Sequence, residues 1–225
     1  MAVLIFNVGF TAEYVMRVLA RRSIQNVEKV YLVTIESQDS YAQKRSQEAI
    51  NSIVSYLATV GVTDVEVIKV SPEWDFDEIV ERISERVGGY DDYEFYLVGG
   101  TRMTLLSLYF IALILAQADG VRVKAVAFDE AMTNSKELPL RIPQIPSGEK
   151  LNLLLMIREG ESVSELARKT GKSASTISIQ LSDLEDEGLV VRSRDGKRKE
   201  VGLTPLGRTV LNLLGETGLV KAVQG

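Results

Sequence analysis

The sequence contains neither cysteine nor histidine, and the two absences exclude several classes of site. Without cysteine the chain forms no disulfide, no thiolate nucleophile, no iron–sulfur cluster and no cysteine-ligated zinc site. Without histidine it forms no Ser-His-Asp triad and no histidine-ligated metal site. A carboxylate-bound Mg²⁺ is the alternative that these absences leave open, but we expect neither a metal nor a cofactor. A chain without cysteine also suits a reducing cytoplasm.

Long apolar runs are absent as well. The longest apolar segment, 103–116, has 14 residues, whereas a helix that crosses a bilayer needs about 20. Residues 1–9 lack the basic start of a signal peptide and are typical of a β-strand. We expect a cytoplasmic protein that does not enter membranes.

Charge is divided unevenly along the 225 residues. Residues 1–146 carry 14 basic and 20 acidic side chains, whereas residues 147–225 carry 12 basic and 11 acidic ones. Five basic residues and one Asp fall within the short stretch 192–199. Because the local field at a docking face decides nucleic-acid binding, the weakly acidic whole does not argue against it.

Residues 1–133 alternate between short apolar runs and segments with helical spacing of their apolar residues. Strands that alternate with helices of this length form right-handed βαβ units and a parallel sheet. We predict an α/β fold, a Rossmann-like, doubly wound, mostly parallel sheet with strand order 3-2-1-4-5. The pattern predicts strands at 3–8, 27–35, 65–70, 95–98 and 121–128, and helices at 11–22, 41–60, 76–87 and 104–118.

The segment 134–147 differs, because it contains Pro139, Pro143 and Pro146 and little helical pattern. We predict an edge strand at 136–140 and then a stiff linker. The predicted domains are a ligand-sensing domain at 1–133, this connecting segment, and a second domain at 148–225.

The second domain shows the signals of a helix-turn-helix followed by a β-hairpin. Ser162 and Glu165 have capping-box spacing at the start of one helix. Gly171 suits a tight turn after that helix, and Ser173 can cap the next one. The Asp195-Gly196 dipeptide predicts a hairpin turn. About residues 148–215 resemble a winged helix-turn-helix, which is an α+β fold.

This resemblance implies that the second helix enters the major groove of double-stranded DNA and that the hairpin, or wing, lies along a phosphate backbone. The alternative is a winged helix that contacts only protein, because the second half of the helix carries four acidic residues, Asp183, Glu185, Asp186 and Glu187. The predicted DNA-binding residues are Ser173, Ser175, Thr176, Ser178 and Gln180 on the helix, and Arg192, Arg194, Lys197, Arg198 and Lys199 on the wing.

Two glycine-containing turns follow the first and fourth predicted strands, at residues 7–11 and 98–102. In the order 3-2-1-4-5 these strands are neighbours at the topological switch point, where doubly wound folds bind ligands. Each turn opens a helix whose free N–H groups suit phosphate, and Arg102 adds a guanidinium fork. For Gly9 alone, a plain tight connection between strand and helix is the alternative.

The residues of these turns resemble the two ligand motifs of CARF domains, with Arg17 following the first. Joined to a winged helix, they make the whole chain resemble the archaeal CRISPR-associated CARF–winged-helix transcription regulators. The resemblance implies a homodimer that binds a cyclic oligoadenylate, which we expect to be the tetra-adenylate, across its two-fold axis. Arg17 is ambiguous because it could pair with Glu13 instead. The implied ligand-binding residues are Gly9, Phe10, Thr11, Gly99, Gly100, Thr101 and Arg102.

The helix expected at 104–118 is apolar all round, so both of its sides need cover. We predict that one side packs on the sheet and the other on a second copy of the chain, with burial under the C-terminal domain as the alternative. The predicted function is a ligand-responsive DNA-binding regulator of CRISPR-associated genes. The runner-up is a metal-independent ring nuclease that cuts the cyclic oligoadenylate, in which Thr11 aligns the nucleophile and Arg102 stabilises the transition state.

Overall fold

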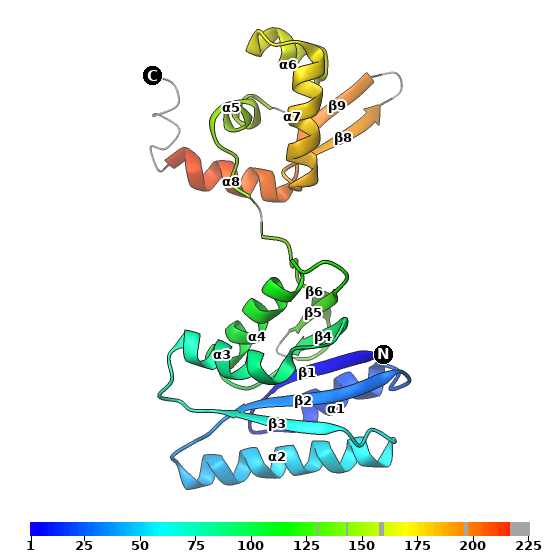
Figure 1. Cartoon of the computed structure of the whole chain (residues 1–225), viewed down its shortest axis with the longest axis vertical. Coiled ribbons are helices and arrows are strands. Elements are labelled where there is room, and N and C mark those ends of the chain that lie inside the picture. The colour runs from blue at the N-terminus through cyan, green and yellow to red at the C-terminus, as the bar shows by residue number, and fades with distance from the viewer. Residues whose placement is uncertain (130, 143, 158–159, 196–197, 217–225) are drawn as a thin grey trace. The chain divides into compact units, whose positions relative to one another are not determined.

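The computed structural model describes residues 1–129, 131–142, 144–157, 160–195 and 198–216. The chain divides into two compact units, Met1–Arg141 and Ile142–Gly225 (Figure 1). The division falls within the segment 134–147 that the sequence assigns to the connection. Each unit buries apolar side chains of its own.

The first unit is built on a six-stranded sheet in the order β3-β2-β1-β4-β5-β6. The first five strands of that order pair in parallel, and β6 runs antiparallel to β5. The predicted α/β class and the predicted order of the first five strands are therefore confirmed. The edge strand is shorter than expected, 135–137 in place of 136–140. The strands are β1 (Ala2–Val8), β2 (Val27–Ile35), β3 (Val65–Val70), β4 (Asp92–Leu97), β5 (Arg122–Phe128) and β6 (Ser135–Glu137).

Helices cover both faces of this sheet, which is why β1, at its centre, is buried along its whole length. One core lies between the sheet and α1 and α2, and the other between the sheet and α3 and α4. Figure 1 shows these two helix layers on either side of the strands. The helices are α1 (Glu13–Arg21), α2 (Ser40–Thr59), α3 (Phe76–Val87) and α4 (Arg102–Leu115).

Helix α4 buries one side and leaves the other open. Ser107, Leu108 and Ile111 are buried against the sheet. On the opposite side Leu106 and Ile114 are 52% and 51% exposed. One edge of α4 also holds the chain that leaves β6, because the hydroxyl of Tyr109 donates a 2.6 Å hydrogen bond to the carbonyl of Pro139. Within the described residues, no helix combines the length and apolarity needed to cross a membrane.

The second unit has the elements of a winged helix-turn-helix, as predicted. Both halves of the capping box at Ser162 and Glu165 are formed, and Gly171 ends α6 with a left-handed φ of 70°. The wing strands span 190–195 and 198–203. A short strand that the sequence did not indicate, β7, completes an antiparallel sheet in the order β7-β9-β8. The elements are α5 (Gly148–Met156), β7 (Glu161–Ser162), α6 (Val163–Thr170), α7 (Ala174–Asp186), β8 (Val190–Asp195), β9 (Arg198–Leu203) and α8 (Pro205–Glu216).

Candidate functional site

The turns after β1 and β4 lie directly against each other, because the two strands are neighbours in the sheet. Asn7, the next-to-last residue of β1, is fully buried and joins them. Its side-chain oxygen accepts a 2.9 Å hydrogen bond from the backbone N–H of Val98 and a 3.4 Å one from that of Gly99. Its side-chain nitrogen donates to the carbonyl of Gly99. The amide of Asn7 thus fixes the second turn to the first strand.

Glycine is required where the two turns touch. A Cβ atom on Gly9 would lie 2.9 Å from the backbone nitrogen of Gly100 and 3.3 Å from its Cα. Gly100 itself has a φ of 66°, which L side chains rarely adopt. The contact between the two turns therefore explains by itself why position 9 is a glycine, without any role in ligand binding.

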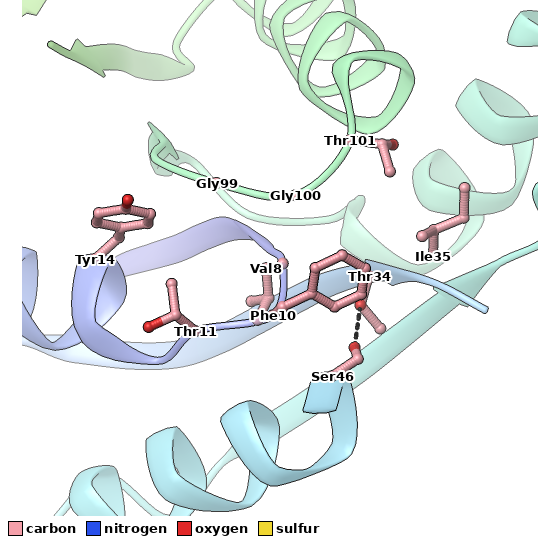
Figure 2. A pocket seen from close by; sticks show the side chains of 11 residues that line it. Val8, Phe10, Thr11, Tyr14, Thr34, Ile35, Ser46, Gly99, Gly100 and Thr101 are labelled. Carbon is pink, nitrogen blue, oxygen red and sulfur yellow. Dashed lines mark hydrogen bonds between the residues drawn. The ribbon is translucent and has the colours of Figure 1, made fainter. Parts of the chain in front are cut away.

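A cavity of about 270 Å³ opens beside these turns. It brings together six of the seven predicted ligand residues, and Figure 2 labels Phe10, Thr11, Gly99, Gly100 and Thr101 among them. The seventh, Arg102, does not line it; this residue is exposed and begins α4, which Thr101 caps. None of the eleven lining residues carries a charge. They are Val8, Gly9, Phe10, Thr11, Tyr14, Thr34, Ile35, Ser46, Gly99, Gly100 and Thr101.

Four lining side chains come from positions that the sequence analysis did not name. Thr34 and Ile35 end β2, and Ser46 lies on α2. The hydroxyls of Thr34 and Ser46 are buried and 3.0 Å apart, in hydrogen-bond contact (dashed in Figure 2). Tyr14 lies in the first turns of α1. The end of β2 could have been found, since the predicted order places it next to β1, whereas nothing in the helix pattern marks Ser46.

A second cavity, of about 280 Å³, shares Tyr14, Gly99 and Gly100 with the first. Asp129 lines it. Hydrogen bonds from Thr133 and Asn134 hold the Asp129 carboxylate and lower its pKa to about 2. This carboxylate is therefore anionic and already bonded within its own loop.

Arg17 pairs with Glu13, which the sequence analysis gave as the alternative to a ligand contact. Its guanidinium is bound to the carboxylate of Glu13 and lies 3.4 Å from the carbonyl of Ala131. It does not line the first cavity.

The front of α7 presents the short hydroxyls that the sequence assigned to DNA. Ser173 caps the helix, accepting a 3.1 Å hydrogen bond from the backbone N–H of Thr176. Ser173, Ser175, Thr176 and Ser178 are all exposed. Ile179, which the sequence analysis did not single out, stands among them with 65% of its surface exposed.

Two predicted DNA contacts have partners within the protein. The Gln180 amide is half-buried and donates a 3.2 Å hydrogen bond to Glu149 of α5. Lys172 also binds that carboxylate, and this pairing lowers the pKa of Glu149. Arg192 donates a 2.6 Å hydrogen bond to Glu185 of α7, which lowers the pKa of the Glu185 carboxyl. Of the remaining predicted wing contacts, Lys197 lies outside the described residues, as do the side chains of Arg194, Arg198 and Lys199.

Comparison with known families gives a match for each unit. Residues 2–135 match the model of the Csa3 CRISPR-associated Rossmann-like domain. Residues 149–191 match that of the bacterial regulatory protein, arsR family. No curated protein matches the chain.

Among solved structures, the chain is similar to Can2 from Sulfobacillus thermosulfidooxidans in complex with cyclic tetra-adenylate. The identity is 10% and the TM-score 0.46, over 95% of this chain and 57% of the Can2 chain. A chain in the structure of Drosophila ORC bound to AT-rich DNA and Cdc6 gives 11% identity and a TM-score of 0.22, over 96% of this chain and 86% of that one. At these TM-scores neither similarity establishes a shared fold.

Proposed function

The chain belongs to the family of the Csa3 CRISPR-associated Rossmann-like domain, and from this membership we propose that it is a cytoplasmic transcription regulator that senses a cyclic oligoadenylate. The ArsR-type helix-turn-helix in the second unit implies DNA binding. We propose the CRISPR-associated genes as its targets. The observation that carries the proposal is the gathering of six predicted ligand residues around one cavity at the carboxyl ends of β1 and β4.

The chemistry of this cavity suits part of a nucleotide. Its wall is mainly apolar, with the Phe10 ring and the Thr34 and Ser46 hydroxyls available to a base. Phosphate would lie toward the N-terminus of α4, where free backbone N–H groups and the exposed guanidinium of Arg102 favour negative charge. We propose cyclic tetra-adenylate as the ligand.

We propose a homodimer formed through the open side of α4. Met103, Leu106, Phe110 and Ile114 recur at helical spacing on that side and are all exposed. A second copy is the occupant that fits, because a cyclic ligand with two-fold symmetry and a DNA site made of two half-sites both call for two subunits. Since α4 begins at Arg102, this arrangement would bring two copies of the predicted phosphate site to one interface.

For DNA we propose that the hydroxyls of α7 approach base edges and phosphates and that the wing follows the backbone. The ion pair of Arg192 and the hydrogen bond of Gln180 make these two residues positioning groups for α7 rather than free contacts. The exposed serines and Thr176 stay available.

Native mass spectrometry of the whole protein with a panel of cyclic oligoadenylates tests the proposal. We expect a dimer that binds one intact cyclic tetra-adenylate. A monomer, or one ring bound per subunit, would reject the shared site. Linear fragments that accumulate with time would show that the protein cleaves the ring, and would favour the ring-nuclease hypothesis over the sensor hypothesis.

A further inference from the structure

The first cavity cannot neutralise a phosphate by itself, because no lining residue is charged. A cyclic oligoadenylate carries one negative charge for each nucleotide. If such a ligand binds here, cations outside the wall must meet its phosphates. Arg102 is one of them, on the side of α4.

A second cation, Arg45, lies next to the cavity on the side of α2. It directly precedes the lining residue Ser46 and is itself exposed. Its guanidinium carbon is 5.9 Å from the ring centre of Phe10, which lines the cavity and is 48% exposed. The same carbon is 5.9 Å from the ring centre of Tyr41, one helical turn earlier. Two aromatic rings therefore lie within cation–π distance of this guanidinium.

Among the residues that the structure describes, Arg45 binds no carboxylate. No ion pair within the part of the chain that the structure describes includes it. The neighbouring cations differ: Arg17 pairs with Glu13, Lys44 with Glu48, and Lys69 with Glu36. A positive charge without an acidic partner, next to an uncharged cavity, is what an anionic ligand requires.

We propose that Arg45 is a further ligand-binding residue, which contacts a phosphate of the molecule in the first cavity while its face rests on Phe10 and Tyr41. The inference rests on the proposed function and names a residue outside both glycine-containing turns. Aromatic rings attract the flat face of a guanidinium and leave the N–H donors at its edge free. Because the rings restrict this long side chain before the ligand arrives, less conformational entropy is lost on binding.

The test measures binding of cyclic tetra-adenylate by calorimetry to three variants of the full chain. Arg45→Gln should weaken binding about 10- to 100-fold, as expected when one hydrogen bond to a charged group is removed. Arg45→Lys should recover only part of that loss, because an ammonium keeps the charge but not the planar donor edge. Lys44→Gln is the matched control, since it removes one positive charge from the adjacent position of α2, and it should stay within about 2-fold of the wild type.

The outcomes separate the inference from the function on which it rests. If Arg45→Gln binds as well as Lys44→Gln, the contact with Arg45 does not exist, although the sensor function stands. If the wild type binds none of the cyclic oligoadenylates, the proposed ligand is wrong and the inference falls with it. Equal melting temperatures of the variants and the wild type show that the fold is unchanged.

Discussion

Replacing Gly9 by Ala tests whether the two turns touch as closely as the structure shows. The new Cβ would lie 2.9 Å from the backbone nitrogen of Gly100. Real Cβ atoms essentially never lie within 3.0 Å of such an atom, so one of the two turns would have to shift. The atoms that this Cβ meets belong to backbone that Asn7 already holds, and they cannot rotate away as a side chain could.

The expected cost follows from comparison with a glycine that has room. A Gly→Ala change where alanine can adopt the native φ and ψ gains about 0.4–1 kcal/mol by restricting the unfolded chain, and neither Gly9 nor Gly88 has a positive φ. Gly88→Ala should show this gain, because a Cβ there would meet its nearest neighbour, the carbonyl oxygen of Ser84, at an ordinary 3.6 Å. Overpacking costs about 1–3 kcal/mol, so Gly9→Ala should be less stable than Gly88→Ala by about that amount. For a unit of this size, the difference lowers the melting temperature by roughly 3–12 °C.

The assay is thermal unfolding followed by tryptophan fluorescence. The single tryptophan of the chain, Trp74, lies half-buried between β3 and α3, so its signal reports on the first unit alone. A Gly9→Ala variant that melts no lower than Gly88→Ala would refute the close contact between the turns.

Three further predictions address the proposed ligand site, the wing and the sheet. Arg102→Ala should weaken binding of cyclic tetra-adenylate about 10- to 100-fold, which calorimetry will measure. The melting temperature followed by tryptophan fluorescence should not fall, because this exposed side chain has no hydrogen bond or ion pair within the described residues. Replacing Lys197 and Arg198 together by Ala should weaken binding to specific and unrelated DNA alike. The slope of the logarithm of the binding constant against the logarithm of salt concentration should become shallower by about 0.9 for each phosphate that is no longer neutralised. An unchanged slope in a fluorescence-anisotropy titration across a salt series would show that the wing does not contact DNA. Burial alone would raise the pKa of Glu94, but hydrogen bonds from Arg22 and Tyr96 outweigh it and lower the pKa below its ordinary value. The ionised carboxylate therefore stabilises the fold at pH values above its unfolded pKa of about 4.3. The stability difference between the wild type and Glu94→Gln should shrink as the pH falls below that value. Thermal unfolding of both proteins at pH 7 and at about pH 3.5 measures this difference.

The sheet and most of the lining of the first cavity could be predicted because their signals are local in the sequence. Each apolar run and each helical segment carries its own periodicity, and the strand order then brings the turns after β1 and β4 together. This reasoning finds residues on the turns themselves. It misses Ser46, which is buried only because α2 packs against the end of β2, and no local pattern records that packing.

On the predicted DNA surface, too, the local sequence pattern gives the face of the helix but not the contacts that other elements make with it. Helical spacing places Gln180 on the front of α7 with the serines. It cannot indicate that Glu149 of α5 accepts a hydrogen bond from that amide. Likewise, the basic composition of the wing does not reveal that Arg192 is paired with Glu185. An apolar residue on a helix suggests a core position, and only the packed structure shows that Ile179 faces solvent.

The bonds of Asn7 limit how the first unit can respond to a ligand. A binding site formed by two independent loops can close when one loop moves toward the other. Here Asn7 joins one turn to the other, and Gly9 is already in contact with Gly100. We therefore expect the two turns to move together, and α4, which continues directly from the second turn, to move with them. Because Tyr109 of that helix donates a hydrogen bond to the carbonyl of Pro139, we expect such a displacement to reach the start of the segment that leads to the second unit.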